Sequence, residues 1–297
     1  MPEPWQKKRI DEIVQALNWD SRKIMFKNDR LGNTNTSLLC EYLGEKYIFR
    51  IGTALIEKIS INRKNEQSTI KNMMGENFNF DVIFFSEKTG DMVSKYIDGE
   101  SIAPKIYDTE KFIDDACDVL KKFHKHSAEY YFYPMEDIEK RIELVKTNCI
   151  LRQDKFVNIY NEYIIVADRQ KKTDEEFVRF CHNDTYLSNF KYDNNRQLHL
   201  LDYEFSGMGN MFFDMACIAH SPLGKLGEER VEQLIKNMLG SYSDQLRKNL
   251  EDYIVIQLMW NCTWAAVKAT ENEIGREKFC SLTNRYIQLL GEILNIP

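Results

Sequence analysis

The sequence has 297 residues, which is enough for one or two globular domains. Its 40 Lys and Arg residues against 46 Asp and Glu residues give a net charge of −6. This balance argues against a general nucleic-acid-binding protein, because such proteins are usually basic. Apolar runs are far shorter than the roughly 20 residues of a membrane span, and the first thirty residues show no secretory signal. Seven scattered cysteines without a C-x-x-C pair predict reduced thiols and a cytoplasmic location.

The pattern of apolar residues predicts a small β-rich part followed by a large helical part. In the first part we expect a helix at 3–18, turns at 28–35, a hairpin of strands 37–42 and 47–51, a helix at 54–74, and strands 80–86 and 92–97. In the second part we expect helices at 109–126, 135–148, 154–170, 211–219, 228–239, 245–270 and 277–294, with a β segment at 178–204. Thr109 is the expected N-cap of the first of these helices. The boundary falls near Asp98-Gly99, and we expect ligands to bind between the two parts.

The β segment at 178–204 holds the residues with the clearest chemistry. Asp184 and Asn189 form a D-x-x-x-x-N pattern in a loop, and Asp202 and Glu204 end an apolar strand. Phosphoryl transfer needs a carboxylate to accept the hydroxyl proton, and an amide oxygen and a carboxylate to hold magnesium. Asp184 is therefore the predicted base, Asn189 and Asp202 are predicted metal ligands, and Glu204 shares the strand face of Asp202 and supports a metal or its waters. The alternative is that these are ordinary turn residues.

His182 precedes this loop and has two interpretations. It acts in catalysis, or it orients the loop through a hydrogen bond to the backbone.

Three short segments resemble motifs of the choline and ethanolamine kinase family, which is related to aminoglycoside phosphotransferases and protein kinases. Cys181–Asp184 is similar to the C-H-N-D loop, Leu201–Ser206 to the I-D-x-E-Y/F-S strand end, and Phe213-Asp214 to the F/W-D of the next helix. The resemblance covers nearly the whole chain. It implies an α+β, two-lobed protein-kinase-like fold with a small antiparallel β N-lobe (1–97) that binds nucleotide. The large, mostly helical C-lobe (98–297) would carry the catalytic and acceptor-binding groups.

The same resemblance implies ATP and Mg²⁺ as cofactors and a set of nucleotide-binding residues. Leu31–Thr36 resembles the family's nucleotide loop L-G-G-x-T-N, without its second glycine. Arg50 stands where the fold places its phosphate-binding base, Glu66 matches the helix acid that pairs with it, and the strand at Lys95 and Ile97 would meet the adenine through its backbone. The implied nucleotide-binding residues are Asn33, Thr34, Asn35, Thr36, Arg50, Glu66, Lys95 and Ile97.

On the acceptor side, the family binds a quaternary ammonium with aromatic faces and a carboxylate. Trp260 and Trp264 are four residues apart on one helix face, and with Phe279 and Asp184 they are the implied acceptor-binding residues. Two positions depart from the family pattern: Ser221 replaces an acidic residue, and Asn261 replaces the first Trp of W-x-x-W. Tryptophans at this spacing are equally typical of a helical core.

These observations favour an ATP-dependent kinase that phosphorylates the hydroxyl of choline or a similar small amino alcohol by direct in-line transfer. Ethanolamine, thiamine or an aminoglycoside are alternative acceptors. A non-catalytic nucleotide-binding module is an alternative of another class, but the predicted base and metal ligands are all present. A protein kinase is disfavoured because the chain lacks A-P-E and G-x-G-x-x-G. We expect no nucleic-acid partner and no membrane insertion, and the oligomeric state is left open.

Overall fold

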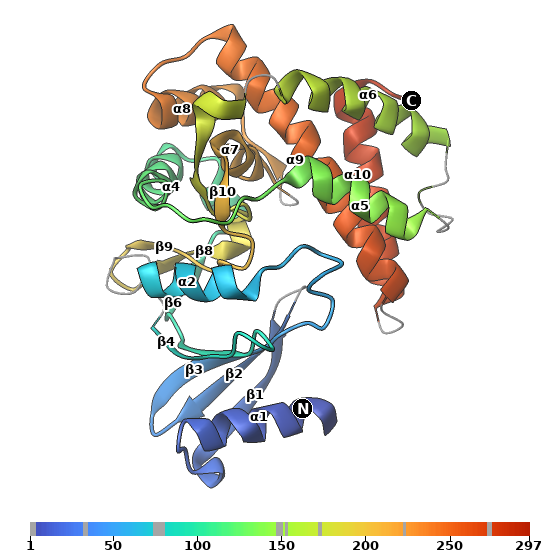
Figure 1. Cartoon of the computed structure of the whole chain (residues 1–297). Coiled ribbons are helices and arrows are strands. Elements are labelled where there is room, and N and C mark those ends of the chain that lie inside the picture. The colour runs from blue at the N-terminus through green and yellow to red at the C-terminus, as the bar shows by residue number, and fades with distance from the viewer. Residues whose placement is uncertain are drawn as a thin grey trace. The chain divides into compact units, whose positions relative to one another are not determined.

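The computed structural model describes residues 4–31, 35–73, 81–146, 151, 154–171, 174–221, 224–271 and 275–297 (Figure 1). The chain forms two compact units: the first holds Met1–Ile56, Ile61–Ser101 and Lys191–Glu204, and the second holds the remainder. The first unit therefore includes a segment that the sequence analysis assigns to the second domain. The division into a nucleotide-binding part that ends at Ile97 and a catalytic and acceptor-binding part that follows it stays a prediction. No helix within the described ranges is long and apolar enough to cross a membrane.

The first unit is built on a five-stranded antiparallel sheet covered by a helix. The strand order is β1-β2-β3-β5-β4, with β1 (Ile24–Leu31), β2 (Thr36–Tyr42), β3 (Glu45–Ile51), β4 (Val82–Phe85) and β5 (Met92–Lys95). Alternate residues of β2 are buried, as expected for a sheet with one covered face. Helix α1 (Pro4–Ala16) buries an apolar stripe of Ile10, Ile13 and Val14 in the same cluster as Leu38, Cys40, Phe49, Ile51 and Val93. The predicted β2–β3 hairpin is confirmed, with Thr36 paired to Ile51.

Two predictions for this unit were wrong. The stretch predicted as turns at 28–35 contains the second half of β1, and no strand was predicted at 24–31. This polar segment pairs with β2 through its backbone, with a bulge between Phe26 and Arg30. The helix predicted from residue 54 begins only at α2 (Arg63–Met73). The Asn62 side chain accepts a hydrogen bond from the Asn65 amide and caps the helix there, and Ser60 just before it has a left-handed φ of 62°.

A second, three-stranded sheet has the order β6-β8-β9, with β6 (Gly99–Ser101), β8 (Phe190–Asp193) and β9 (Leu198–Leu200). The Asp193 carboxylate accepts hydrogen bonds from the amides of Asn195 and Gln197 and closes the turn between β8 and β9. Strand β9 leads directly into the acidic segment that contains Asp202 and Glu204.

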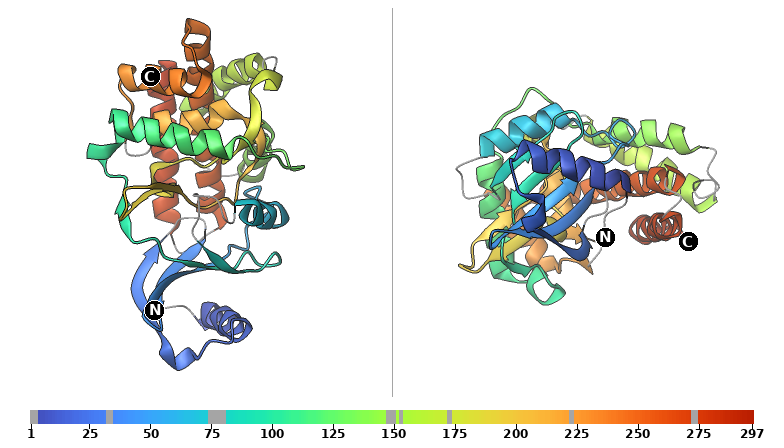
Figure 2. Two further views of the ribbon diagram at one scale, coloured as in Figure 1. Left: turned by 90° about the vertical axis from the view of Figure 1, so that its left-hand side faces the viewer. Right: turned by 90° about the horizontal axis from the view of Figure 1, so that it is seen from below.

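The second unit is mostly helical. Its α-helices are α3 (Pro104–Tyr107), α4 (Glu110–Phe123), α5 (Pro134–Val145), α6 (Asp154–Gln170), α7 (Met211–Ala219), α8 (Glu228–Leu239), α9 (Asp244–Glu271) and α10 (Arg276–Leu294). Helices α9 and α10 pack side by side (Figure 2), and α9 is buried on nearly all sides from Asn249 onward. The predicted helices 211–219 and 228–239 are confirmed over the same residues.

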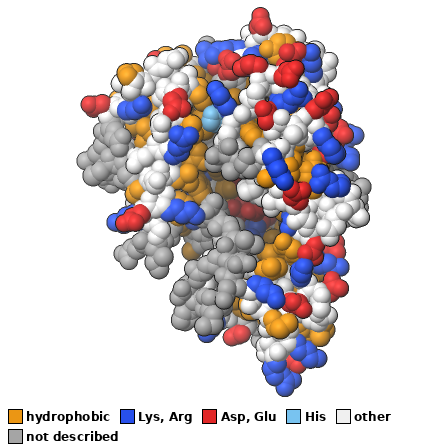
Figure 3. Space-filling model, turned by 180° about the vertical axis from the view of Figure 1, so that it is seen from behind, with side chains coloured by type: hydrophobic (Ala, Val, Ile, Leu, Met, Phe, Trp, Pro, Cys, Tyr) orange, Lys and Arg blue, Asp and Glu red, His pale blue; other side chains and the backbone are white. Residues whose placement is uncertain are grey.

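Short strands and 3₁₀ turns complete the two units. Strands β7 (Val178–Cys181) and β10 (Gly207–Asn210) pair antiparallel, as do β11 (His220–Ser221) and β12 (Gly224–Lys225). The 3₁₀ turns are η1 (Ser21–Lys23), η3 (Asp174–Phe177) and η4 (Leu187–Asn189). Charged side chains of both signs are scattered over the face in Figure 3, so the net charge is not gathered into one acidic patch there.

The N-cap of α4 provides a test of local stability. The Thr109 hydroxyl accepts a hydrogen bond from the Phe112 amide and donates one to the Ile106 carbonyl. We expect Thr109→Ala to lower the free energy of unfolding by about 1 kcal/mol. Urea denaturation followed by circular dichroism measures the change. Thr109→Ser keeps both hydrogen bonds and should unfold like the parent, and equal losses in the two variants would show that the cap contributes nothing.

Candidate active site

A buried ion pair joins the sheet to helix α2 in the first unit. Arg50 at the end of β3 and Glu66 on α2 lie 2.5 Å apart, between Nη1 and Oε1, and are 3% and 0% exposed. Arg50 also donates from Nε and Nη2 to the Gly90 carbonyl. Burial alone would lower the pKa of Arg50, but the carboxylates of Glu66, Asp202 and Glu204 raise it above its ordinary value. The guanidinium is therefore held charged in the interior.

Arg63 extends this pair into a network that the sequence analysis did not include. Its Nη1 lies 2.7 Å from a Glu66 oxygen and 3.2 Å from a Glu204 oxygen, and its Nη2 donates to Asn35 Oδ1. Asn35 in turn donates from Nδ2 to Glu204 at 2.7 Å. A sequence signal for Arg63 exists, because it stands three residues before Glu66, a spacing that places both side chains on one face of a helix.

Asp202 is the accessible end of the network. Its side chain is 35% exposed, its Oδ1 lies 3.3 Å from Arg50 Nη1, and its φ of 67° is a left-handed conformation that is uncommon outside glycine. Burial, together with the charge of Glu204, raises the pKa of Asp202 to about 7. Such strain and pKa shifts concentrate at functional sites.

The donor set fits a hard divalent cation. Carboxylate oxygens of Glu66, Asp202 and Glu204 lie within 4.8 Å of one another, and when Asp202 is ionised their three negative charges exceed the two positive charges of Arg50 and Arg63. An added cation would remove this imbalance, and carboxylate oxygens are the ligands that Mg²⁺ prefers.

The other predicted nucleotide-binding residues have simpler surroundings. Lys95 is half exposed, and its ammonium lies 3.2 Å from the Asp81 carboxylate. Ile97 is partly buried just after β5, and Thr36 begins β2. Asn33 and Thr34 lie outside the described residues. These positions neither group the side chains around one ligand nor exclude the backbone contacts that the resemblance implies.

In the second unit, one carboxylate anchors the predicted catalytic loop. Asp214 on α7 is fully buried and accepts hydrogen bonds from the backbone amides of His182, at 3.0 Å, and Asn183, at 2.7 Å. Its Oδ2 also lies 2.9 Å from Nε2 of His124 at the end of α4. The sequence analysis named Asp214 only as part of a motif and missed His124, whose partner is ninety residues away in the sequence.

The loop brings three predicted residues together. Asn189 donates from Nδ2 to the Asp184 carboxylate and to the Asp184 carbonyl, both at 2.7 Å. The Asp184 amide donates to His182 Nδ1 at 3.2 Å, which is the orienting role proposed as the alternative to catalysis. Asn183, between them, has a left-handed φ of 62°. Asn189 thus holds the Asp184 carboxylate, while His182 holds the backbone amide of the same residue.

Trp260 is surrounded by protein groups. It is 2% exposed and packs edge-on against Phe205 and Phe213. The buried guanidinium of Arg141 lies 4.2 Å from its ring centroid and donates to the Trp260 carbonyl. The Trp260 ring therefore already has a cationic partner from the same chain.

Trp264 and Phe279 do meet, at a centroid distance of 5.7 Å in an edge-to-face arrangement. They are 7% and 6% exposed, and the Lys268 ammonium lies 5.9 Å and 5.4 Å from their centroids. Asn261, which replaces the first Trp of the family pattern, donates to the hydroxyl of Tyr186, and Gln257 donates to the same hydroxyl. Helix α9 thus contributes Trp264 to an aromatic pair with Phe279 of α10, and contributes the buried amides of Gln257 and Asn261 to Tyr186.

Gly90 is a sharp test of the Arg63 network. A Cβ at Gly90 would lie 2.2 Å from Arg63 Nε, and the φ of Gly90 is 70°. Gly44 in the β2–β3 turn has a φ of 86° and nothing within 4 Å of its Cβ position. We expect Gly44→Ala to cost about 1 kcal/mol for its backbone alone, and Gly90→Ala to cost a further 1–3 kcal/mol or so because it displaces Arg63. Denaturant unfolding of both variants isolates the difference, and equal costs would contradict a rigid network.

The sequence is similar to known proteins and to a family model. The family model described as Choline/ethanolamine kinase matches residues 30–220. An uncharacterized protein of Mycoplasma pneumoniae, the MG356 homolog, is 24% identical over 268 residues, which cover 89% of this chain and 86% of that protein. Protein LicA of Haemophilus influenzae is 22% identical over 224 residues, which cover 72% and 78%.

Solved structures share the fold. The choline kinase LicA from Streptococcus pneumoniae has a TM-score of 0.78 at 19% identity, with 97% of this chain and 99% of that chain covered. A spectinomycin phosphotransferase has a TM-score of 0.68 at 9% identity, with 96% and 98% covered. The predicted α+β protein-kinase-like fold is confirmed. The chain belongs to the choline/ethanolamine kinase family and is a small-molecule kinase that transfers a phosphoryl group from ATP to an alcohol.

Proposed function

We propose that this kinase phosphorylates the hydroxyl of choline or a closely related small amino alcohol, with Mg²⁺ and ATP. The observation that carries the proposal is the pair of Asp184 and Asn189, held together by two 2.7 Å hydrogen bonds on a loop whose amides are bound to Asp214. A carboxylate fixed in this way is prepared to receive a hydroxyl proton at a defined position. The relatives named as LicA support choline as the acceptor.

In the proposed reaction, Asp184 orients the acceptor hydroxyl and accepts its proton as the oxygen attacks the γ-phosphorus of ATP. The O–P bond forms while the bond to ADP breaks, without a covalent enzyme intermediate. Asn189 holds the Asp184 carboxylate through its amide N–H, and the His182 ring accepts the Asp184 backbone amide. The supporting groups therefore act by positioning.

The proposed metal ligands are Asn189 and Asp202, with Glu204 supporting a second ion or its waters. When bound, Mg²⁺ would neutralise the phosphate charge. Arg50 is the proposed phosphate-binding base, and Glu66 keeps its guanidinium in place at 2.5 Å. Asn33, Thr34 and Thr36 are proposed to approach the phosphates, and the backbone at Lys95 and Ile97 to meet the adenine.

Acceptor recognition is proposed to rest on the Asp184 carboxylate and on Trp264 with Phe279. Because Arg141 already lies over the Trp260 ring, Trp260 is a weaker candidate for contacting a quaternary ammonium than the resemblance implies. That observation favours a second candidate acceptor, ethanolamine, whose primary ammonium can be bound by hydrogen bonds instead of aromatic faces.

The first test is ADP release with Mg²⁺ and ATP across choline, ethanolamine and thiamine. We expect choline to stimulate turnover most and Asp184→Asn to lower kcat roughly 100-fold or more, because an amide cannot accept the proton. Asp118→Asn is the matched control, since Asp118 is exposed on α4, and it should leave turnover unchanged. Stimulation by ethanolamine alone would replace choline as the acceptor, and full activity in Asp184→Asn would refute the assigned base.

The second test addresses the metal. We expect Asp202→Asn to raise the Mg²⁺ concentration for half-maximal turnover about tenfold or more, because one anionic ligand is lost. The midpoint temperature of thermal unfolding, measured in the presence of a chelator, should not fall. The substitution also relieves the repulsion between Asp202 and Glu204 that contributes to the raised pKa of Asp202. An unchanged Mg²⁺ requirement would remove Asp202 from the metal site.

A further inference from the structure

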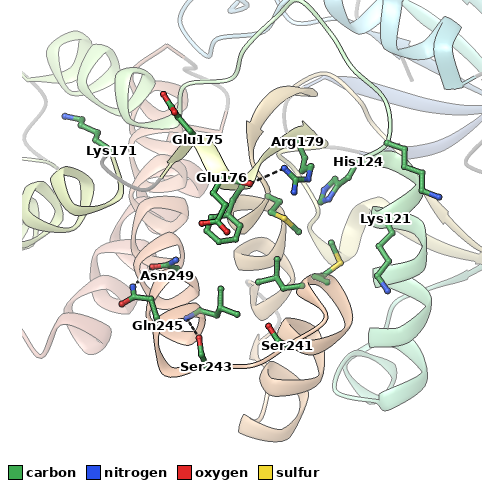
Figure 4. Close-up of a pocket in the computed structure, with 16 residues that line it drawn as sticks. Lys121, His124, Lys171, Glu175, Glu176, Arg179, Ser241, Ser243, Gln245 and Asn249 are labelled. Carbon is green, nitrogen blue, oxygen red and sulfur yellow. Dashed lines mark hydrogen bonds between the residues drawn. The ribbon is translucent and has the colours of Figure 1, made fainter.

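A large pocket opens on the second unit, and its lining includes none of the residues assigned above to nucleotide, metal or acceptor. Its volume is about 1470 Å³, and it is bordered by the end of α4, η3 with β7, the end of α8 and the start of α9 (Figure 4). The lining combines charged, polar and apolar side chains. A pocket of this kind is a default candidate for a ligand site.

The charged lining residues are predominantly basic. Four of them are cations, Lys121, Lys125, Lys171 and Arg179, against two carboxylates, Glu175 and Glu176. This surplus stands out in a chain whose net charge is −6. In the described part of the chain, neither Lys121, Lys125 nor Arg179 forms an ion pair with a carboxylate, whereas Lys171 lies 3.3 Å from Asp168. In Figure 4, Lys121, His124 and Arg179 lie on the same side of the pocket.

The rest of the lining is divided between apolar and neutral polar groups. The apolar residues are Phe177, Met211, Met238, Leu239 and Leu246. Ser241, Ser243, Gln245 and Asn249 line the side formed by the beginning of α9. The N-terminus of this 28-residue helix adds partial positive charge to the same side.

We propose that this pocket binds a small amphipathic organic anion, specifically a phosphomonoester with an aliphatic or aromatic part. Lys121, Lys125 and Arg179 supply the charge for the phosphate, since guanidinium and ammonium groups are the usual partners of phosphate oxygens. The apolar side chains receive the organic part, and burying each methylene there adds to affinity. The basic residues alone would not select for the organic part, and the apolar residues alone would not select for the phosphate.

The pocket is linked to the predicted catalytic loop indirectly, through His124 and then Asp214 on α7. His124 lines the pocket, and its Nε2 lies 2.9 Å from the Asp214 oxygen that also accepts the His182 amide. An anion beside His124 therefore acts on the group that anchors the loop. Occupancy should change kcat, and this part of the inference rests on the proposed kinase activity, whereas the binding itself does not.

The test is isothermal titration of the full chain with inorganic phosphate, ethyl phosphate and hexyl phosphate, in saturating ADP so that the nucleotide site is filled. We expect hexyl phosphate to bind at least tenfold more tightly than phosphate. Lys121→Glu combined with Arg179→Glu should abolish this binding, and Met238→Asp should remove the dependence on chain length. Lys8→Glu, an exposed lysine on α1, is the control and should bind like the parent.

Binding that survives the double charge reversal lies elsewhere and overturns the proposed site. Equal affinity for phosphate and hexyl phosphate overturns the assignment of an amphipathic ligand. The coupling is tested separately by turnover. Hexyl phosphate should change kcat in the parent protein but should leave the kcat of the His124→Gln variant unchanged. Binding in the pocket without any change of kcat would refute the coupling alone, and absence of all turnover would refute the proposed function while the titration still decides the site.

Discussion

The first unit depends on the mutual neutralisation of charges that it buries. Arg50, Arg63, Glu66 and Glu204 are each at most 4% exposed, and an unpaired charge at such a depth would cost several kcal/mol. Each guanidinium is therefore shared between carboxylates, and Arg50 also donates to the Gly90 carbonyl and Arg63 to the Asn35 side chain. This requirement brings β3, α2, the Gly90 turn and the segment after β9 to one point. It also places Asp202, the accessible end of the network, 3.3 Å from Arg50.

In the second unit, one buried carboxylate binds the backbone amides of a loop. A loop that carries functional side chains cannot pair its backbone as a strand does, and buried amides without partners are costly. Asp214 accepts two of these amides and its backbone carbonyl accepts the Thr185 hydroxyl. The Asn183 side chain adds a bond to the Phe205 carbonyl. The position of the loop that carries Asp184 thus depends on hydrogen bonds to Asp214 and to the Phe205 carbonyl.

The sequence predicted what depends on local pattern. Helix α7 and helix α8 have clear periodicity or strong apolar character and were located over the residues observed, and the D-x-x-x-x-N spacing correctly grouped Asp184 with Asn189. Strand β1 was not predicted because its sequence is polar, and its pairing with β2 through the backbone cannot be recognised from composition. Arg63 and His124 were not predicted as site residues because Glu204 and Asp214, to which they bind, are distant from them in the chain. The Arg141 guanidinium over Trp260 shows the same limit, since spacing indicates a shared face but not what already covers it.

The discontinuity of the first unit has a consequence for how the chain is made. Its two long segments end at Ser101, yet its charge network is completed only by Glu204, which enters with the segment Lys191–Glu204. During synthesis the ribosome therefore produces the sheet and α2 about one hundred residues before the carboxylate that Arg63 and Asn35 both bind. Until then the nascent first unit holds a guanidinium without its second partner. The charge network of the first unit is therefore complete only after the loop that precedes this late segment has been translated.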